Sequence, residues 1–443
     1  MSEWKKVKIG EICQIIKGTT GIASAEPGEY PLVVTAVERK TCSSFQFDCE
    51  AVCIPLVSSS GHGKKSLNNV HYQKGKFALG TILCAVVPNN PNELDARFLH
   101  QYLQFYKDKI LVPLMKGAAN VSLSMKDIAK VEIPLPSIEK QHELSELFVE
   151  AQKKYKELLE ESEKQKSLVK HLRQNILQDA IEGKLTEEWR KENPVVKGNP
   201  DFDAEALFEK IQEEKCHTDS ELLRNSKKKV FEPISENEQP FEIPEGWKWV
   251  RLGEIVENIT SGSREWARYY SDTGAIFLRM GNLSRESYVL RLDNIQHVRV
   301  PESSEGKRTR LLPFDLLFSI TAEIGNLGLI PKDFPEAYIN QHTARIRFAQ
   351  LVKQSLYFAN ALLAPGIRKL YLPNAHGMKN SFRLDTLSFI PIPLPPLAEQ
   401  KEIVSRVEKL LENVVELEKQ ITERETMTKQ LMQSIMKDAF REE

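Results

Sequence analysis

Apolar residues recur at alternating steps of four and three along two long segments of the chain. Charged residues flank these positions on both sides. Such heptad spacing places the apolar residues on one face of an α-helix and is typical of coiled coils. We therefore predict two long helices, each pairing with a partner helix rather than lying solvated on a single domain. The predicted seams, with polar positions at Gln165 and Arg424, are Leu144, Phe148, Ala151, Tyr155, Leu158, Ser162, Gln165, Val169, Leu172 and Ile176, and Ile403, Val407, Leu410, Val414, Leu417, Ile421, Arg424, Thr428, Leu431 and Ile435.

Both helical segments begin with nearly the same sequence. IPLPSIEKQ occupies residues 133–141 and IPLPPLAEQ residues 392–400, and the similarity continues without a gap at a shift of 259 residues. About 14 of the 48 positions from 133 to 180 are identical in the second copy. The stretches WKKVKIGEI at 4–12 and WKWVRLGEI at 247–255 form a further matching pair. The chain therefore contains an internal duplication.

Each half also contains a segment with the pattern of a mixed α/β domain. Short apolar runs bounded by Gly, Pro and Asn predict strands, and each half has a helical stretch before its Pro-rich motif. The strand-like runs lie at 30–37, 51–59, 78–87, 275–280, 315–321 and 338–348, and the helices at 96–110 and 354–363. We predict an α+β fold with two such domains (1–136 and 244–395), a central helix (137–190), a linker (191–243) with a short helical candidate at 203–215, and a distal helix (396–443). Ser137 is expected to cap the central helix.

Composition narrows the function classes only slightly. The net charge of -1 gives no overall nucleic-acid or membrane signature, and no apolar run approaches the length of a membrane span. The first residues, MSEWKKVKIG, lack the apolar core of a signal peptide. The six cysteines form no CxxC pair, which is typical of free thiols. We expect a cytoplasmic protein with reduced cysteines and no metal site.

Motifs for catalysis are absent from the sequence. There is no GxxxxGK[ST], HExxH, GxSxG or strand-linked GxGxxG, and the Asn-Pro-Pro-aromatic motif of amino-methyltransferases is missing. GHGKKS at 61–66 lacks the earlier glycine of a phosphate-binding loop and is interpreted as a turn. We therefore predict a protein that has no active site of its own.

Polar loops after strands are the best candidates for a binding surface. IPLVSSSGHGKKSLNNVHY (54–72) and LLFSITAEIGNLGLIPKDF (316–334) combine turn glycines with side chains suited to base edges. For any one residue a solvated surface is the alternative; for the basic residues together we favour phosphate contact. The candidates are His62, Lys64, Lys65, Asn68, Asn69, Thr321, Glu323, Asn326, Asn340 and Gln341, with a basic run of Arg264, Arg268, Arg279, Arg285, Arg291, Arg299, Lys307, Arg308 and Arg310.

The order of these motifs resembles a known family. W-x-x-V-x-[IL]-G-E-I, a variable domain, I-P-L-P-x-[IL]-x-x-Q and a long helix, all repeated once, resemble the specificity subunit of type I restriction–modification enzymes. EGKLTEEWRKENP (182–194) is similar to that family's usual continuation of the central helix. The resemblance covers essentially the whole chain.

The resemblance implies a non-catalytic, sequence-specific DNA-binding subunit. Two target recognition domains would each read half of a split site in double-stranded DNA. The helices would form an antiparallel coiled coil with a pseudo-two-fold axis, docking two methyltransferase subunits. Restriction (motor) subunits complete the complex; S-adenosylmethionine, ATP and Mg²⁺ would bind to partners and not to this chain.

Two alternatives stay open at this point. One is the recognition part of a single-chain restriction–methyltransferase, against which the missing cofactor motifs argue. The other is a coiled-coil scaffold that binds proteins rather than DNA. A test for S-adenosylmethionine binding by the isolated chain addresses the first, and a gel shift with DNA addresses the second.

Overall fold

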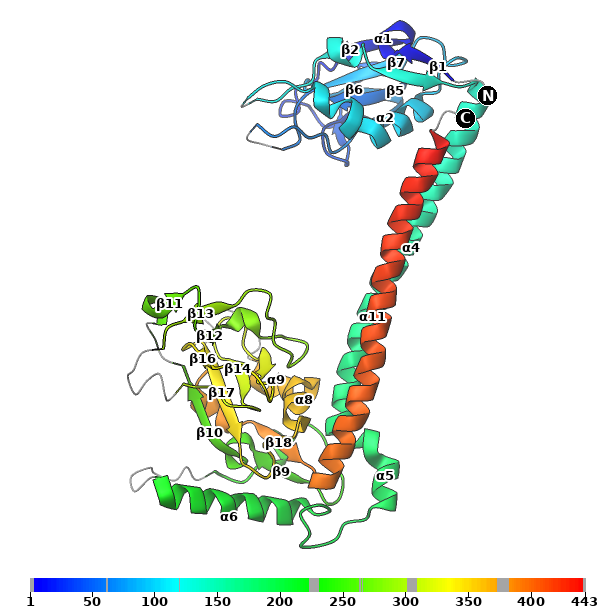
Figure 1. The fold of residues 1–443 in the computed structure, drawn as a ribbon. Coiled ribbons are helices and arrows are strands. Elements are labelled where there is room, and N and C mark those ends of the chain that lie inside the picture. The colour runs from blue at the N-terminus through cyan, green and yellow to red at the C-terminus, as the bar shows by residue number, and fades with distance from the viewer. Residues whose placement is uncertain are drawn as a thin grey trace. The chain divides into compact units, whose positions relative to one another are not determined.

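The structure consists of two compact units (Figure 1). It is a computed structural model that describes residues 4–60, 63–118, 120–222, 231–262, 264, 266–300, 309–372 and 382–440, with only the backbone at 217–222. Unit 1 comprises residues 1–164 with 421–443, and unit 2 comprises 165–420. The long helices α4 (Ile138–Ile181) and α11 (Leu397–Ala439) contribute one half each to both units.

Unit 1 contains a six-stranded sheet with a core on each face. Its elements are β1 (Lys5–Lys8), α1 (Ile9–Ile12), β2 (Cys13–Lys17), β3 (Tyr30–Val33), β4 (Lys40–Cys42), β5 (Phe47–Pro55), β6 (His71–Leu79), β7 (Leu83–Pro88), α2 (Ala96–Ile110), η1 (Val112–Leu114), α3 (Met125–Ile128) and β8 (Glu132–Leu135). The strand order is β2-β7-β5-β6-β3-β4, antiparallel except for β3 with β6. Because side chains alternate along a strand, Val52 and Ile54 of β5 pack in the core with α2, whereas Ala51 and Cys53 face a second core.

Unit 2 contains two four-stranded sheets. Its elements are η2 (Lys184–Thr186), α5 (Glu187–Glu192), α6 (Ala204–Leu222), η3 (Glu236–Glu238), β9 (Lys248–Arg251), η4 (Leu252–Glu254), β10 (Val256–Ser261), η5 (Trp266–Tyr269), β11 (Tyr270–Ser271), β12 (Ala275–Leu278), η6 (Met280–Asn282), β13 (Gln296–Val298), β14 (Leu316–Ser319), β15 (Leu327–Leu329), β16 (Ala337–Ile339), β17 (Thr343–Phe348), α8 (Tyr357–Leu363), α9 (Pro365–Tyr371), α10 (Leu384–Ser388) and β18 (Pro391–Leu394). The sheets have the orders β10-β17-β14-β15 and β11-β13-β12-β16. Ile276 and Leu278 of β12 face one core, and Phe277 between them faces another.

The duplicated motifs build the same small sheet in each half. β1 pairs antiparallel with β8, and β9 with β18. The register is equivalent, since Val7 lies opposite Ile133 and Val250 opposite Ile392. We call this strand pair, with the helix that follows it, the repeated frame. It joins the start of each domain to the start of its long helix.

A buried glutamine fixes the start of each long helix. The Nε2 of Gln141 donates to the carbonyl of Pro136 at 2.9 Å, and that of Gln400 to Pro395 at 2.8 Å. Both glutamines are almost fully buried. Each side chain supplies a hydrogen-bond donor to the proline carbonyl just before its helix, so this buried polar group is satisfied. The predicted cap is confirmed: Ser137 Oγ accepts from the backbone N–H of Lys140 at 3.3 Å.

The two long helices pair antiparallel within each unit. In unit 1 a shallow cavity is lined by Ala151 and Tyr155 of α4 and by Thr428 and Met432 of α11. In unit 2 Arg173 of α4 forms an ion pair with Glu418 of α11 at 3.1 Å. The predicted coiled coil is therefore confirmed, and its partners are the two copies of the same segment.

The predicted seam is wrong at several positions. Four of its leucines and Arg424 are exposed, while the neighbouring Leu159 and Met432 are half-buried instead. The predicted seam was built from alternating steps of four and three residues. Where a three-residue step is used in place of a four-residue step, the predicted position moves by one residue and falls on the flank of the helix instead of in the seam. The exposed leucines are Leu158, Leu172, Leu417 and Leu431.

The C-terminal end of each helix is buried in a domain core. Just after α11, the ring of Phe440 packs against Phe98, Tyr102, Phe105 and Tyr106 in unit 1, with centroids 5.3–6.1 Å apart. At the equivalent place in unit 2, Ile181 of α4 is fully buried. Burying such a side chain stabilises the fold by about 1.5–3 kcal/mol, so both ends are firmly anchored.

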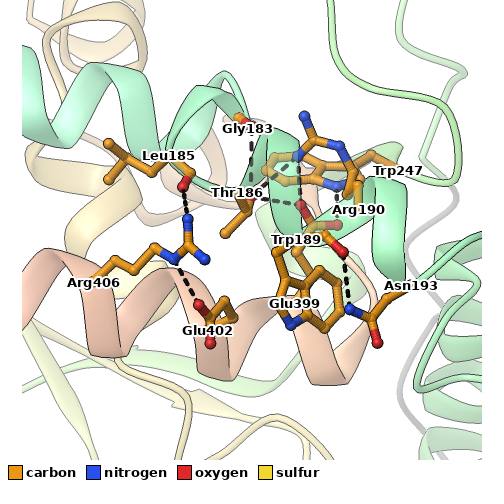
Figure 2. A network of polar contacts seen from close by, with 10 residues as sticks. All are labelled: Gly183, Leu185, Thr186, Trp189, Arg190, Asn193, Trp247, Glu399, Glu402 and Arg406. Atoms are coloured by element: carbon orange, nitrogen blue, oxygen red, sulfur yellow. Dashed lines mark hydrogen bonds and ion pairs between the residues drawn. The ribbon is translucent and has the colours of Figure 1, made fainter.

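The segment after α4 is held by a buried carboxylate (Figure 2). Glu399 of α11 accepts hydrogen bonds from Thr186 Oγ1 at 2.7 Å, Arg190 Nη1 at 2.5 Å and Trp247 Nε1 at 2.7 Å. Next to it, Arg406 donates to Glu402 and to the carbonyl of Leu185. Only 2% of Glu399 is exposed, and a carboxylate this deeply buried is tolerated because three donors compensate its charge.

The segment predicted as a linker is partly folded onto unit 2. The helical candidate at 203–215 is α6, which is longer than predicted. Its Leu207 and Ile211 are buried, and Gln212 donates to the carbonyl of Glu254 at 2.9 Å. The domain boundaries themselves stay a prediction.

We expect the substitution Glu399→Ala to lower the free energy of unfolding of unit 2 by about 3–5 kcal/mol, because it leaves a half-buried guanidinium and a buried hydroxyl and indole N–H without their acceptor. The control is Glu418→Ala, which removes a half-exposed partner of Arg173 and should cost no more than about 1 kcal/mol. Urea unfolding followed by tryptophan fluorescence reports mainly on unit 2, where four of the five tryptophans lie. Equal losses for both variants would contradict this role of Glu399.

Candidate nucleic-acid interface

Two polar side chains of unit 2 meet where parallel strands end. β12 and β16 are parallel neighbours, with Leu278 opposite Ile339 (Figure 1). The next residues, Arg279 and Asn340, therefore lie at the same edge of the sheet. Both line an open cavity of about 490 Å³, which we call the polar cavity. Its other lining residues are Met280, Gly281, Asn282, Arg291, Asp293, Asn294 and His342.

Asn282 fixes one wall of the polar cavity. Its Oδ1 accepts from the backbone N–H of Arg279 at 2.9 Å. Its Nδ2 donates to the carbonyls of Arg291 and Asn294 at 2.9 and 3.1 Å. Asn282 is buried, so these bonds hold two loops together from the inside, while Arg291 is exposed at the rim. The wall thus presents a cation on a rigid backbone.

His342 joins three of the predicted residues on the other side. Gln341 Nε2 donates to His342 Nε2 at 2.9 Å, and His342 Nδ1 lies 2.9 Å from Thr321 Oγ1. With Nε2 as acceptor, Nδ1 carries the proton and donates to the hydroxyl. Asn340 Oδ1 accepts from the backbone N–H of His342 at 3.0 Å. The group Thr321, Asn340, Gln341 and His342 therefore offers donors and acceptors on one surface, as base edges require.

The turn beside Thr321 has an unusual backbone. Ala322 has φ of 56°, in the left-handed region that residues other than glycine seldom adopt. Ser319 holds the turn closed: its hydroxyl donates to the carbonyl of Glu323 and accepts from the backbone N–H of Asn326 at 2.8 Å. Such local strain is typical of functional loops, and Thr321, which lies 2.9 Å from His342, directly precedes the strained residue.

The other predicted residues of unit 2 lie elsewhere. Asn326 is buried and its Nδ2 donates to the exposed Glu323 at 2.9 Å, so its amide stabilises the turn. Arg264 and Arg268 are exposed near η5, where the Arg268 guanidinium lies 5.0 Å from the ring centroid of Tyr269. Arg285 lines a different cavity. The basic run is thus spread over several surfaces, and its members Lys307 and Arg308 lie outside the described residues.

In unit 1 the predicted loop is closed by its own serines. Ser58 Oγ donates to the carbonyl of Lys64 at 2.5 Å, and Ser60 Oγ lies 2.7 Å from Ser66 Oγ. Leu67 is buried beneath the loop. As a result Lys64 and Lys65 are exposed, as is Asn68. Asn69 is half-buried and donates to the carbonyl of Thr35 at 3.4 Å, and His62 lies outside the described residues.

Sequence reasoning missed a polar group beside this loop. Arg39 Nε donates to Gln73 Oε1 at 3.1 Å, and its Nη1 lies 3.3 Å from His71 Nδ1. Burial, together with the charge of Arg39, lowers the pKa of His71 to about 4, so this imidazole is neutral at physiological pH. No spacing in the sequence links Arg39 to His71, because the contact arises only when β6 folds beside the loop after β3.

The comparisons with known proteins agree on one family. The family model for the type I restriction modification DNA specificity domain matches residues 1–175 and 244–424. The chain belongs to this family. The match covers both halves, in keeping with the duplication.

Individual relatives carry the same designation. The type I restriction enzyme EcoAI specificity subunit of Escherichia coli is 28% identical over 54% of this chain and 39% of its own length. The EcoDI specificity subunit of the same organism is 25% identical over 100% of this chain and 88% of its own length. A chain from a solved structure concerning complex assembly and conformational transition of the type I R-M system superimposes with a TM-score of 0.61 at 18% identity, over 100% of this chain and 98% of that one. The last comparison supports the fold.

Family membership leaves the individual contacts as predictions. The two matches to the specificity domain confirm the class of protein. Within the described part of the chain, no helix has the length and apolar character needed to cross a membrane.

We expect Lys64→Ala with Lys65→Ala to weaken binding to a duplex carrying the split DNA site that the family resemblance implies. Because each lysine would neutralise one phosphate, the dependence of log K on log salt should also flatten by about one per lysine. Binding is measured by fluorescence anisotropy across a salt series. Lys153→Ala with Lys154→Ala is the control, since it removes another adjacent exposed pair of unit 1 from α4. An unchanged salt slope would exclude the two loop lysines from the interface.

Proposed function

We propose that this chain reads a bipartite site in double-stranded DNA, one half with each domain, and brings the enzymatic subunits of a type I restriction–modification complex to it. The observation that carries the proposal is the repeated frame. The frame has the same register in both halves, whereas the segments inserted into it differ in sequence and in sheet topology. Two domains that share the same frame but carry different polar surfaces suit the recognition of two different half-sites.

The chemistry of the two surfaces fits this division. Exposed Lys64 and Lys65 suit phosphates, which set position and affinity. At the polar cavity, Arg279 suits guanine and the amide of Asn340 suits adenine, as does the amide of Gln341 beside His342. The exposed side chains of Glu323, Arg264, Arg268 and Arg285 are further proposed DNA contacts, whereas the buried Asn326 supports the turn.

Exposed apolar positions on the long helices support the proposal that the chain binds two protein partners. Leu158, Leu168 and Leu172 of α4 are 45%, 66% and 42% exposed, and their equivalents in the second copy, Leu417, Met427 and Leu431, are 40%, 64% and 58% exposed. Because the pairing is antiparallel, each unit carries one complete set of these positions: Leu158, Met427 and Leu431 in unit 1, and Leu417, Leu168 and Leu172 in unit 2. Two equivalent apolar patches suit two copies of one partner.

We propose that these partners are two methyltransferase subunits, with restriction (motor) subunits joining them. S-adenosylmethionine, ATP and Mg²⁺ would then bind to the partners, and the chain itself would be non-catalytic and cytoplasmic. A single-chain methyltransferase would instead bind S-adenosylmethionine by itself. A pure protein scaffold would give no gel shift with DNA.

Exchanging residues 1–132 for the matching segment of a relative should change one half of the methylated site and leave the other half intact, because both long helices and the second domain are kept. The reciprocal exchange of residues 244–391 should change only the other half. Single-molecule sequencing of methylated genomic DNA from a host carrying each variant reads the result directly. A change in both halves, or in neither, would refute the modular reading.

Met427→Glu should abolish docking at unit 1 alone, and Leu168→Glu docking at unit 2 alone, since a carboxylate in an apolar interface is desolvated without a partner. Native mass spectrometry should therefore show one methyltransferase subunit on each single variant and none on the double variant. Val289→Glu is the control, since Val289 is 66% exposed but lies outside the helices. If the double variant still bound two subunits, the methyltransferase subunits would not dock at these positions of the long helices.

A further inference from the structure

A second cavity of unit 2 is unusually rich in cations. Its volume is about 280 Å³, and it lies where α4 meets the loop after η6 and the helices α8 and α9. It is lined by five cationic side chains, Lys170, Arg173, Arg285, Arg368 and Lys369, and by one carboxylate, Glu286. We call it the cationic cavity. Like charges at such density repel one another unless an anion lies among them.

Few of these charges are balanced by the protein. Arg173 is paired with Glu418 at 3.1 Å, and Lys170 lies 3.8 Å from Glu286 with both side chains mostly exposed. For Arg285, Arg368 and Lys369 the described part of the chain provides no ion pair. The cavity therefore retains an excess of positive charge on the side formed by the loop and α9.

Arg368, which lines this cavity, has unused hydrogen-bond donors. Its Nη1 donates to the carbonyl of Arg285 at 2.7 Å. Its Nε and Nη2 have no hydrogen-bond partner among the described residues and are covered by neighbouring atoms, so a phosphate would reach them only after a small shift of these neighbours. Burial lowers the pKa of Arg368, and the charge of Arg285 acts in the same direction, but a guanidinium stays charged at physiological pH. Nε and Nη2 form one edge of a guanidinium, the geometry that binds two oxygens of one oxyanion.

We propose that the cationic cavity binds one phosphate group, and that in the DNA complex this group is a phosphate of the DNA backbone. The DNA source rests on the proposed function. Asn282 lines the polar cavity and Arg285 the cationic one, and their Cα atoms can be at most about 11 Å apart. That is about three nucleotides along a strand, so one duplex can reach both. The contact positions the DNA against α4 and reads no base.

The test compares two variants of the full chain that each lose two exposed charges. Arg285→Gln with Lys369→Gln changes the cavity, and Lys210→Gln with Lys332→Gln is the control on the same unit. On a duplex carrying the methylated site, the cavity variant should flatten the slope of log K against log salt by about one and weaken binding roughly tenfold at 0.1 M salt. The control should keep the wild-type slope, and both variants should prefer the wild-type half-sites.

Two further measurements identify the source of the phosphate. In the first, single phosphates of the duplex are replaced by neutral methylphosphonates; one position should weaken binding by the wild-type chain and have no effect on the cavity variant. In the second, inorganic phosphate is titrated against chloride at equal ionic strength, and the rise in Tm of the wild-type chain is compared with that of the cavity variant.

Each outcome decides the proposal. Coupling at one methylphosphonate position supports a DNA phosphate. A rise in Tm with phosphate that the cavity variant lacks, without any such coupling, keeps the phosphate site but refutes its DNA source. If neither the coupling nor the phosphate-dependent rise in Tm is observed, the proposal is overturned. If the wild-type chain shows no specific binding to the duplex, the proposed function fails, while the phosphate titration still decides the cavity.

Discussion

Antiparallel pairing of α4 with α11 decides where the duplicated segments lie. It places the end of α11 beside the start of α4, where Phe440 packs into the aromatic cluster of α2. It likewise places the end of α4 beside the start of α11, where Ile181 is buried and Gln178 accepts from the backbone N–H of Gly366. A parallel pair would bring like ends together and leave these apolar ends without a core. Each domain therefore depends on helices from both copies.

The two copies of the duplicated segment share the hydrogen bond that starts the long helix but differ in a neighbouring charged residue. Gln141 and Gln400 make the same bond to the proline carbonyl in both copies. One residue earlier, Lys140 in the first copy is replaced by Glu399 in the second. Only Glu399 meets Thr186 and Arg190, which the segment after α4 supplies. The second copy therefore buries a carboxylate, Glu399, where three hydrogen-bond donors surround it. Among the described residues, no such donors surround the equivalent position of the first copy, which carries the more exposed Lys140.

The domains use different means to expose polar groups on rigid supports. In unit 1 serine hydroxyls close a loop from within and direct lysines outward. In unit 2 the ends of two parallel strands bring Arg279 and Asn340 together, and His342 links the amide of Gln341 to the hydroxyl of Thr321. A side chain that is held by hydrogen bonds before binding loses less conformational entropy when it meets a ligand, which favours selective contacts.

The sequence by itself determined the elements with the strongest period. The 3.5-residue spacing predicted the two long helices, the duplicated motifs marked the segments that start each domain and each helix, and α2 was predicted at 96–110, where it lies. Strand β6 was missed, because its first six residues, HYQKGK, have the polar composition of a loop. The exposed lysines of unit 1 were also predictable, since charged residues next to a turn glycine are seldom buried.

Only the tertiary structure decided which neighbours on a helix face the seam, because residues such as Leu158 and Leu159 differ in direction and not in chemistry. It also decided the polar sites. Arg279 and Asn340 are distant in sequence and meet because their strands are parallel neighbours, while Asn326 turns inward to hold a turn. Arg39 with His71, and Arg368 with Lys170, are brought together in the same way. Periodicity encodes which face of an element is apolar, but long-range packing sets which elements meet, and the chemistry of a site depends on that meeting.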